Sequence, residues 1–211
     1  MIIDTGRTTR DAAGRLRDAG VSTVFRYYAR RTRLPEKRLT RPEAEALISA
    51  GIAIGAVFQN AGDSGDCFSA ALGEADGACA RDYATAEIGQ PAGSAIYFAV
   101  DYDASDADIA ARILPHFEAV RREIAGAGNR PGYRLGAYGT GRVCEALHKA
   151  GLADLTWLSN KPGDVAFDAW TLRQDPPDSL CGLPVDRSHP GEGIADFGAF
   201  ARLDVPIAGP G

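Results

Sequence analysis

Two hydrophobic periods alternate along the chain. Short apolar runs rich in Val, Ile and aromatic residues predict buried strands, and the segments between them, where apolar residues recur every three or four positions, predict amphipathic helices. Strands are expected in the stretch 96–106 and at residues 2–4, 22–28, 52–59, 134–139, 155–159, 167–174 and 183–188. Helices are expected near residues 8–19, 40–51, 105–126, 142–150 and 195–200, with an Ala-rich helical region that ends near residue 89.

Polar residues mark where several of these helices begin. Thr8 with Asp11, and Thr40 with Glu43, have the spacing of a capping box, in which a hydroxyl and a carboxylate satisfy the first free N–H groups. Ser105 is predicted to cap a third helix. These signals support the helical assignments and leave the apolar runs between them as strands.

The order of the elements predicts the fold. Eight strands, mostly separated by helices, favour an α/β fold of the (β/α)8 TIM-barrel type as a single domain over residues 1–211. The last three units are expected to be irregular, because the connections between their strands are too short for full helices. An open doubly wound sheet is the main rival. That fold usually carries a glycine-rich phosphate loop after its first strand, whereas "DTGRTTRD" has one glycine.

The charge balance argues against nucleic-acid binding, because the formal net charge is −5 and such proteins usually present a basic face. A local basic cluster formed by Arg26, Arg30, Arg31 and Arg33 is interpreted as a solvated loop. No apolar run approaches the roughly 20 residues of a membrane span, and the first residues read as a strand rather than a signal peptide.

The cysteines and histidines suggest no metal or cofactor. Their spacing matches neither a zinc knuckle nor a redox motif, so no metal site and no organic cofactor are predicted. The cysteines are interpreted as unpaired, partly buried thiols, with a Cys67–Cys79 bridge as the alternative. The residues concerned are Cys67, Cys79, Cys144 and Cys181, and His116, His148 and His189.

Two aspartates leave the end of the fourth strand, in "IYFAVDYDASD". Strand alternation places Tyr97, Ala99, Asp101 and Asp103 on one face, and a barrel opens to its active site at the carboxyl ends of its strands. Residues two apart on a strand are about 6–7 Å apart. Two carboxylates at this separation can hold different protonation states, one as an acid and one as an anion.

Other predicted strands bring further acids and aromatic rings to the same mouth. Asp4 and Asp186 lie on the first and last strands, which are neighbours in a closed barrel. Aromatic faces stack on sugars and paired carboxylates cleave glycosidic bonds, so the mouth is predicted to bind a glycan. Aspartates at strand ends also serve as turn formers or caps, and residues 26–28 can equally close the barrel. The predicted substrate-binding residues are Tyr28, Gln59, Tyr138, Trp157, Trp170 and Gln174.

The order of these short motifs resembles the lysozyme-like barrels of glycoside hydrolase family 25. It is similar, more closely still, to a bacterial group of glycoside-hydrolase-like domains of unknown function, which share "RYY" and "YFAVDYD". The resemblance spans nearly the whole chain, and its specificity comes from the order of the motifs. The motifs that carry it are "IIDTG", "VDYD", "GAYGT", "TWLS", "AWTLRQ" and "VDRS".

The resemblance implies an N-acetylmuramidase-like glycosidase that acts on bacterial peptidoglycan. Asp4, Asp101 and Asp186 match the acidic ring of family 25, and Asp103 falls where that family has its general-acid glutamate. On this hypothesis Asp103 protonates the leaving oxygen, and Asp101 stabilises the charge at the sugar or orients its N-acetyl group. Asp4 and Asp186 then bind substrate and tune the pair. The aspartate at 103 is one methylene shorter than glutamate, and a misplacement of about 1 Å costs on the order of a hundredfold in rate.

Two alternatives therefore stand beside the muramidase. One is a catalytically weak or inactive barrel that binds cell-wall glycan, and the other is a barrel enzyme on another polysaccharide. In each case the expected partner is a polysaccharide, and the protein is expected to be a monomer that acts at the cell wall, in the periplasm or outside the cell. Delivery by a secretion system, phage-type lysis or excision from a longer chain is then expected.

Overall fold

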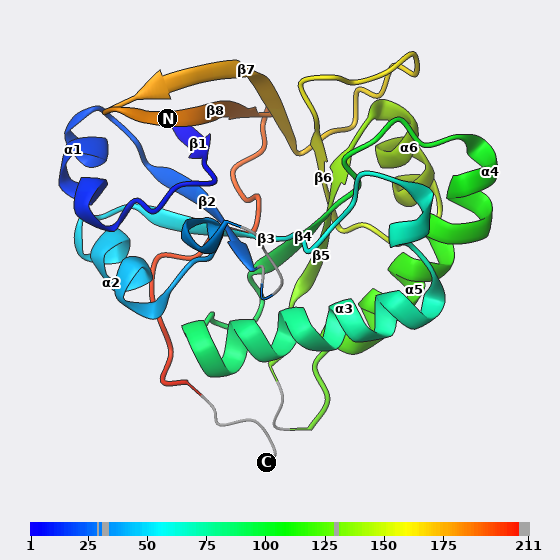
Figure 1. Ribbon diagram of the computed structural model, residues 1–211, viewed down its shortest axis with the longest axis horizontal. Coiled ribbons are helices and arrows are strands. Elements are labelled where there is room, and N and C mark those ends of the chain that lie inside the picture. Colours follow the sequence, from blue (N-terminus) through cyan, green and yellow to red (C-terminus); the bar gives the residue numbers. More distant parts are fainter. Residues whose placement is uncertain (29, 31–33, 129–130, 207–211) are drawn as a thin grey trace.

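Eight strands close into a barrel in chain order, each paired with the next, and β8 returns to β1 (Figure 1). The computed structural model describes residues 1–28, 30, 34–128 and 131–206. The protein is thus a mixed α/β barrel. The strands are β1 (Ile2–Asp4), β2 (Thr23–Tyr28), β3 (Ala53–Phe58), β4 (Ala95–Ala99), β5 (Arg134–Gly139), β6 (Leu155–Leu158), β7 (Leu172–Leu180) and β8 (Leu183–Pro190).

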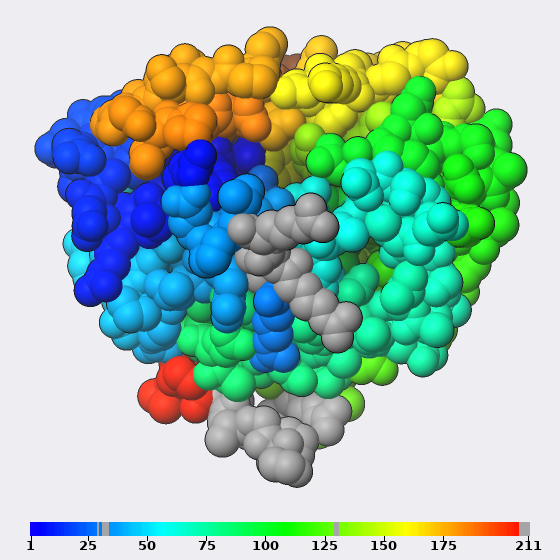
Figure 2. Space-filling view, viewed as in Figure 1, coloured from blue at the N-terminus to red at the C-terminus, as the bar shows by residue number. Residues whose placement is uncertain are grey.

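The direction of β8 departs from a regular (β/α)8 barrel. Strands β1 to β7 pair in parallel, but β8 is antiparallel to both β7 and β1. The cause lies in the connection, since only Cys181 and Gly182 separate β7 from β8 and both have positive φ. A two-residue turn of this kind joins antiparallel strands, whereas a parallel return needs a dozen or more residues. The resulting hairpin packs against the N-terminal segment (Figure 2).

Helices cover the outside of the first six strands. They are α1 (Ala13–Asp18), α2 (Arg41–Ser49), α3 (Ala70–Asp82), α4 (Asp106–Asp108), α5 (Leu114–Ile124) and α6 (Gly141–Lys149). The π-helical segments η4 (Tyr83–Ile88) and η5 (Ile109–Ile113) continue α3 and α4, and single 3-10 turns are η1 (Arg10–Ala12), η2 (Pro35–Lys37) and η3 (Gly65–Cys67).

Two predicted elements are wrong. The helix expected at 195–200 is absent. The segment is irregular, with a bend at Phe197 and Gly198, and Phe200 exchanges backbone hydrogen bonds of 2.8 and 2.9 Å with Ile54. The first helix begins at Ala13 after a 3-10 turn rather than at a Thr8 cap, and Thr9 uses its hydroxyl on Glu43. The other two caps form as expected, since the Thr40 and Ser105 hydroxyls accept from the N–H groups of Glu43 and Asp108.

The barrel interior and the helix-facing shell form separate cores. Tyr97 and Ala99 point into the barrel, whereas Ile96, Phe98 and Val100 pack against the helices, as strand alternation predicts. The interior core contains Ile2, Phe25, Val57, Ala95, Tyr97, Ala99, Leu155, Trp157 and Leu172. Two glycines make room for its rings.

Gly55 and Gly136 are the residues that allow the large rings to fit. A Cβ at Gly55 would lie 2.4 Å from the Phe25 ring, and one at Gly136 would lie 2.5 Å from the Tyr97 ring. Phe25 contacts both Tyr97 and Trp157, with ring centroids 5.5 and 4.6 Å apart. The filled interior therefore forms a solid floor under the open end of the barrel.

Candidate active site

A cavity of about 440 Å³ opens at the carboxyl ends of the strands, and we call it the mouth. It brings together acids, amides and aromatic rings from all eight strands or from the loops that follow them. Its lining residues are Asp4, Tyr27, Val57, Gln59, Ala99, Asp101, Tyr138, Trp157, Ser159, Asn160, Lys161, Gln174, Pro176, Pro177 and Asp186.

Asp4 is the buried acid of the mouth, with only 3% of its surface exposed. The Tyr27 hydroxyl donates to its Oδ1 at 3.1 Å, and the Gln174 amide donates to its Oδ2 at 2.9 Å. Burial outweighs these hydrogen bonds and, helped by the charge of neighbouring Asp186, raises the pKa of Asp4 to about 7. A carboxyl group that holds its proton near neutral pH is a candidate general acid.

Asp186 is the neighbour of Asp4 across the barrel seam. The two residues are register partners in the antiparallel β1–β8 pair, and the Gln174 amide lies 3.5 Å from Asp186 Oδ2. Burial also raises the pKa of Asp186. The two acids are neighbours, as sequence reasoning predicts from the closure of the barrel.

Asp101 lies two residues beyond the end of β4, and its carboxylate is exposed in the mouth. Its N–H donates to the Gly62 carbonyl at 2.7 Å, and the Gln59 amide donates to its Oδ2 at 3.2 Å. A Cβ at Gly62 would lie 2.8 Å from the Ala99 carbonyl, so only glycine allows this close approach. The loop after β3 thus fixes the backbone that presents Asp101.

Lys37 is a cation in the mouth region that the sequence analysis did not single out. Its Nζ donates to Gln59 Oε1 at 2.8 Å and lies 4.3 Å from the centroid of the Tyr27 ring. Burial lowers the pKa of Lys37, although the charges of Asp101 and Asp4 act in the opposite direction. The ammonium group therefore ties the Asp101 side of the mouth to the Asp4 side.

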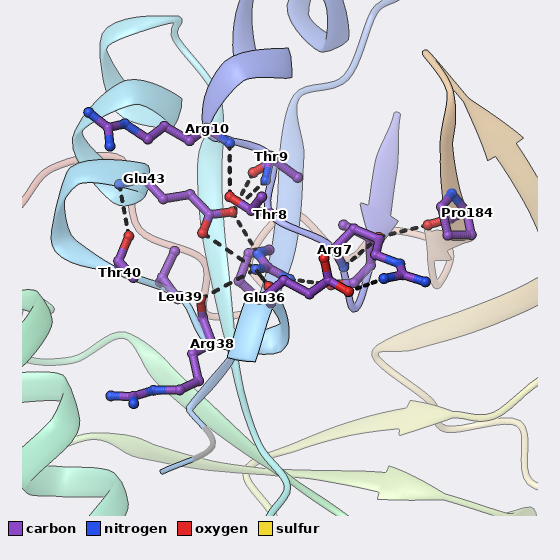
Figure 3. A network of polar contacts seen from close by, with 12 residues as sticks. Arg7, Thr8, Thr9, Arg10, Glu36, Arg38, Leu39, Thr40, Glu43 and Pro184 are labelled. Carbon is purple, nitrogen blue, oxygen red and sulfur yellow. Dashed lines mark hydrogen bonds and ion pairs between the residues drawn. The ribbon is translucent and has the colours of Figure 1, made fainter. Parts of the chain in front are cut away.

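A buried ion pair between Arg26 and Glu43 holds the segment that carries Lys37, and Figure 3 shows the network of polar contacts around Glu43. Arg26 and Glu43 are 0% and 1% exposed, and the Arg26 Nε donates to Glu43 Oε1 at 2.8 Å. The same guanidinium donates to the carbonyls of Glu36 and Arg38, at 2.7 and 3.5 Å. The Arg26 side chain therefore fixes the backbone on both sides of Lys37.

The network also fixes the loop that follows Asp4. Arg26 donates to the carbonyl of Thr5, and the Thr5 hydroxyl donates to the carbonyl of Pro184 at 2.7 Å. Thr9 donates to Glu43 Oε1 through its N–H at 2.7 Å and through its hydroxyl at 2.8 Å. The interpretation of Arg26 as part of a solvated basic loop is therefore wrong. Arg30 is exposed, and Arg31 and Arg33 lie outside the described residues.

The aromatic floor of the mouth comes from β5 and β6. Trp157 is 1% exposed, donates through Nε1 to the Ser188 hydroxyl at 3.1 Å, and packs edge-on against Tyr138 at 5.1 Å. The Tyr138 hydroxyl donates to Gln174 Oε1 at 2.9 Å. Burial and the surrounding acids raise the pKa of Tyr138, so its phenol stays neutral. Tyr138 and Gln174 thus extend one hydrogen-bond chain to Asp4.

Two predicted substrate contacts are not in the mouth. Tyr28 points outward, where it stacks on Tyr83 and donates to Gln90 Oε1 at 2.7 Å, and Tyr27 occupies the mouth instead. Trp170 precedes β7 and therefore lies toward the opposite end of the strands, packed edge-on against His189. The first correction follows from side-chain direction, since neighbouring strand residues face opposite sides. The second follows from a strand boundary, because the strand expected at 167–174 begins only at Leu172.

Asp103 is separated from the other three acids. The strand ends at Ala99, so the alternation that predicts a shared face for Asp101 and Asp103 does not extend this far. Asp103 is exposed and lines an adjoining hollow rather than the mouth. Of the predicted site residues, those brought together in the mouth are Asp4, Gln59, Asp101, Tyr138, Trp157, Gln174 and Asp186.

Further residues of the mouth come from the loop after β6 and from β7. Ser159, Asn160 and Lys161 follow β6, and Pro176 and Pro177 lie in β7, whose pairing with β8 shifts register between Gln174 and Pro177. The sequence signals that mark them are the polar residues directly after the Trp strand and the two prolines after Gln174. In the described part of the chain, no group of three or more His, Cys, Asp or Glu side chains is arranged to hold a metal ion. None of the helices described is long and apolar enough to cross a bilayer.

Comparison with known families identifies a match over most of the chain. A family model described as "Rv2525c-like, glycoside hydrolase-like domain" matches residues 14–191. Two uncharacterized proteins of Bacillus subtilis (strain 168), YbfG and FadG, are 31% identical over 159 residues and 34% identical over 155 residues. Each alignment covers 72% of this chain but only 22% and 26% of the relatives, so the chain spans about a quarter of their length.

Solved structures share the fold. The Mycobacterium tuberculosis Tat-secreted protein Rv2525c, crystallised with L-tartrate, has a TM-score of 0.79 at 19% identity, over 94% of this chain and 97% of that one. A family 25 glycosyl hydrolase from Bacillus anthracis has a TM-score of 0.50 at 13% identity, over 88% and 86% of the two chains. At these identities the likeness shows a common barrel.

Proposed function

Because the chain belongs to the family of Rv2525c-like, glycoside hydrolase-like domains, we propose that it is a glycosidase that cleaves the glycan strands of bacterial peptidoglycan, in the manner of an N-acetylmuramidase. One observation carries this proposal. A buried carboxyl group with a pKa of about 7, Asp4, lines the same cavity as the exposed carboxylate of Asp101. Two carboxyl groups in such different surroundings suit the acid and anion roles of glycoside hydrolysis.

Asp4 is the proton donor in this proposal. It passes its proton to the glycosidic oxygen as the bond from that oxygen to the sugar carbon breaks, and Asp101 stabilises the positive charge that develops on the sugar. Asp101 can alternatively orient the N-acetyl group of the substrate as an internal nucleophile, a known variant of the two-carboxylate scheme. Water then adds to the sugar carbon, and its proton returns to Asp4.

The surrounding residues tune these two groups. Asp186 and the buried position favour the protonated form of Asp4, while Gln174 and Tyr27 hold the orientation of its carboxyl group. Sequence reasoning gave the proton to Asp103, but the exposed position of Asp103 outside the mouth favours Asp4 instead. Asp103 becomes a ligand-binding group of the adjoining hollow.

The place of action is proposed from a relative. Rv2525c is a Tat-secreted protein, and a wall hydrolase must reach the wall, so this domain is proposed to act outside the cytoplasm on the cell wall. Its proposed partner is the peptidoglycan itself, bound by a monomer. The route of export stays open among a secretion system, phage-type lysis and release from a longer chain.

The test is the release of reducing ends from purified peptidoglycan. Wild type is expected to release them, and Asp4→Asn is expected to lose about a hundredfold or more in rate because the general acid is gone. Activity is expected to fall as the pH rises through about 7, where Asp4 loses its proton. Asp11→Asn, which replaces an exposed carboxyl group outside both cavities, serves as the comparison and retains most of the activity. If wild type releases no reducing ends while a family 25 enzyme does, the proposal fails.

A second candidate is a barrel that binds glycan without cleaving it. The observation that favours it is the separation of Asp103 from the mouth, since this position supplies the general acid in the resembling family 25 enzymes. This candidate predicts that peptidoglycan captures both wild type and Asp4→Asn, and that neither releases reducing ends. Turnover by wild type that Asp4→Asn lacks rules it out.

A further inference from the structure

A second hollow of about 300 Å³ adjoins the mouth and shares three of its lining residues, Asp101, Ser159 and Lys161. We call it the side pocket. Its own walls come from the loop after β4, the start of α6 and the loop after β6, where Asp103, Thr140 and Gly163 meet. This volume is within the lower range of small-molecule sites.

Thr140 lines this pocket and carries an unpaired hydroxyl. It occupies the N-cap of α6, where a threonine hydroxyl normally accepts from an N–H group of the first turn, but no such bond forms. The residue is 6% exposed, and its Oγ1 is buried without any hydrogen-bond partner. The caps of α2, α3 and α4, in contrast, are all satisfied by their hydroxyls. A buried polar atom left unpaired costs stability, which suggests that a ligand completes it.

Gly163 keeps the space between Thr140 and Asp103 open. A Cβ at Gly163 would lie 3.4 Å from Asp103 Oδ1 and 3.5 Å from the Cβ of Thr140, so both side chains approach one point above the glycine. The positive φ of 77° at Gly163 also disfavours any residue with a side chain there. The structure therefore keeps this point free.

The walls of the side pocket are fixed in advance. The Ser159 hydroxyl donates to the Lys161 carbonyl at 2.8 Å, and the Gly141 N–H donates to the Pro162 carbonyl at 2.7 Å. The second bond ties the loop after β6 to the first residue of α6. Preorganised donors and acceptors reduce the ordering cost of binding a polar ligand.

We propose that the side pocket is a second sugar subsite, which binds the residue of the glycan next to the one held in the mouth. This inference rests on the proposed function and adds the place and the contacts of a second sugar ring. A carboxylate accepts from sugar hydroxyls, the Thr140 hydroxyl both donates and accepts, and the Lys161 ammonium donates to ring substituents. Because Asp101 borders both cavities, the bond between the two sugars lies beside it.

The test compares one sugar with two by calorimetry. The probes are N-acetylmuramic acid, N-acetylglucosamine and the disaccharide that they form in peptidoglycan. Wild type is expected to bind the disaccharide more tightly than either monosaccharide. Thr140→Val keeps the shape of the side chain and removes only the unpaired hydroxyl, so it is expected to weaken the disaccharide about three- to tenfold. The better-bound monosaccharide is expected to keep its affinity.

Folding is checked by the same variant. Since Thr140 Oγ1 has no partner in the free protein, Thr140→Val is expected to unfold at the same temperature as wild type or higher. Asp103→Asn is the second variant and is also expected to weaken only the disaccharide. Thr85→Val is the matched control, because the Thr85 hydroxyl bonds the Arg81 carbonyl and Thr85 lines neither cavity.

The outcomes separate this inference from its premise. The subsite is refuted if a monosaccharide binds but the disaccharide binds no more tightly. It is also refuted if Thr140→Val leaves the disaccharide affinity unchanged. Neither result contradicts the proposed function of the mouth. If wild type binds none of the three probes, the subsite and the proposed function fail together.

Discussion

Comparison of wild type with Asp4→Asn measures how much folding raises the pKa of the buried acid in the mouth. The buried carboxyl group has a pKa of about 7 in the folded protein, against an ordinary value of 3.8. Below pH 4 both the folded and the unfolded chain carry the proton. As the pH rises, the unfolded chain releases it first, so the wild type loses stability until the pH passes about 7.

The size of this loss follows from the difference between the two pKa values. At about 1.4 kcal/mol per pKa unit, roughly three units correspond to about 4 kcal/mol of folding free energy. Asparagine does not titrate, so Asp4→Asn escapes the loss. Its stability relative to wild type is expected to rise by about 4 kcal/mol between pH 4 and pH 8. Changed hydrogen bonds to Tyr27 and Gln174 shift the whole difference curve without changing this rise.

Urea unfolding at a series of pH values measures the difference curve for the two proteins. Asp11→Asn removes an exposed carboxyl group outside the mouth and is the matched control. Asp186→Asn is expected to shift the rise to lower pH, because the charge of Asp186 helps to raise the pKa of Asp4. If the stability of wild type and of Asp4→Asn changes in parallel with pH, the claim that folded Asp4 keeps its proton near neutral pH is refuted. Its role as proton donor is then refuted as well.

Three further substitutions test the framework around the mouth. Glu43→Gln leaves a buried guanidinium without its counter-charge and is expected to cost about 3–5 kcal/mol in urea unfolding, whereas Glu45→Gln, in an exposed ion pair, costs under about 1 kcal/mol. Gly55→Ala forces a methyl group into the rings of the interior and is expected to cost about 1–3 kcal/mol, while Gly14→Ala, with open space around it, stabilises its helix by about 0.5–1 kcal/mol. Trp170→Ala is expected to leave peptidoglycan binding unchanged in a pull-down assay, and a clear loss contradicts the placement of this ring away from the mouth.

Much of the barrel could be predicted because its strands are short, apolar and separated by helix signals. The closure of the barrel then brings Asp4 beside Asp186, and alternation in β4 separates interior from exterior residues. The reversed β8 was not predicted, although the Cys181-Gly182 turn is its signal. Because the earlier units alternate strand and helix regularly, the last strand was expected to run in the same direction as the others.

The errors in the site have a different origin. Strand β2 is buried on both faces, so its apolar pattern does not tell which of Tyr27 and Tyr28 faces the mouth. Lys37 lies in a connecting loop, and its position depends on a tertiary contact with Arg26 that no local pattern encodes. Asp103 was misplaced because the strand stops at Ala99, and strand ends are poorly defined by sequence.

The seam between β1 and β8 has a consequence for the timing of synthesis. Most of the domain separates Asp4 from Asp186 in the chain, and the barrel closes only when the hairpin that carries Asp186 has emerged from the ribosome. Contacts between such distant parts of a chain form slowly. The acidic mouth is therefore assembled last, so a nascent domain already contains most of the barrel before the cavity between Asp4 and Asp186 is complete.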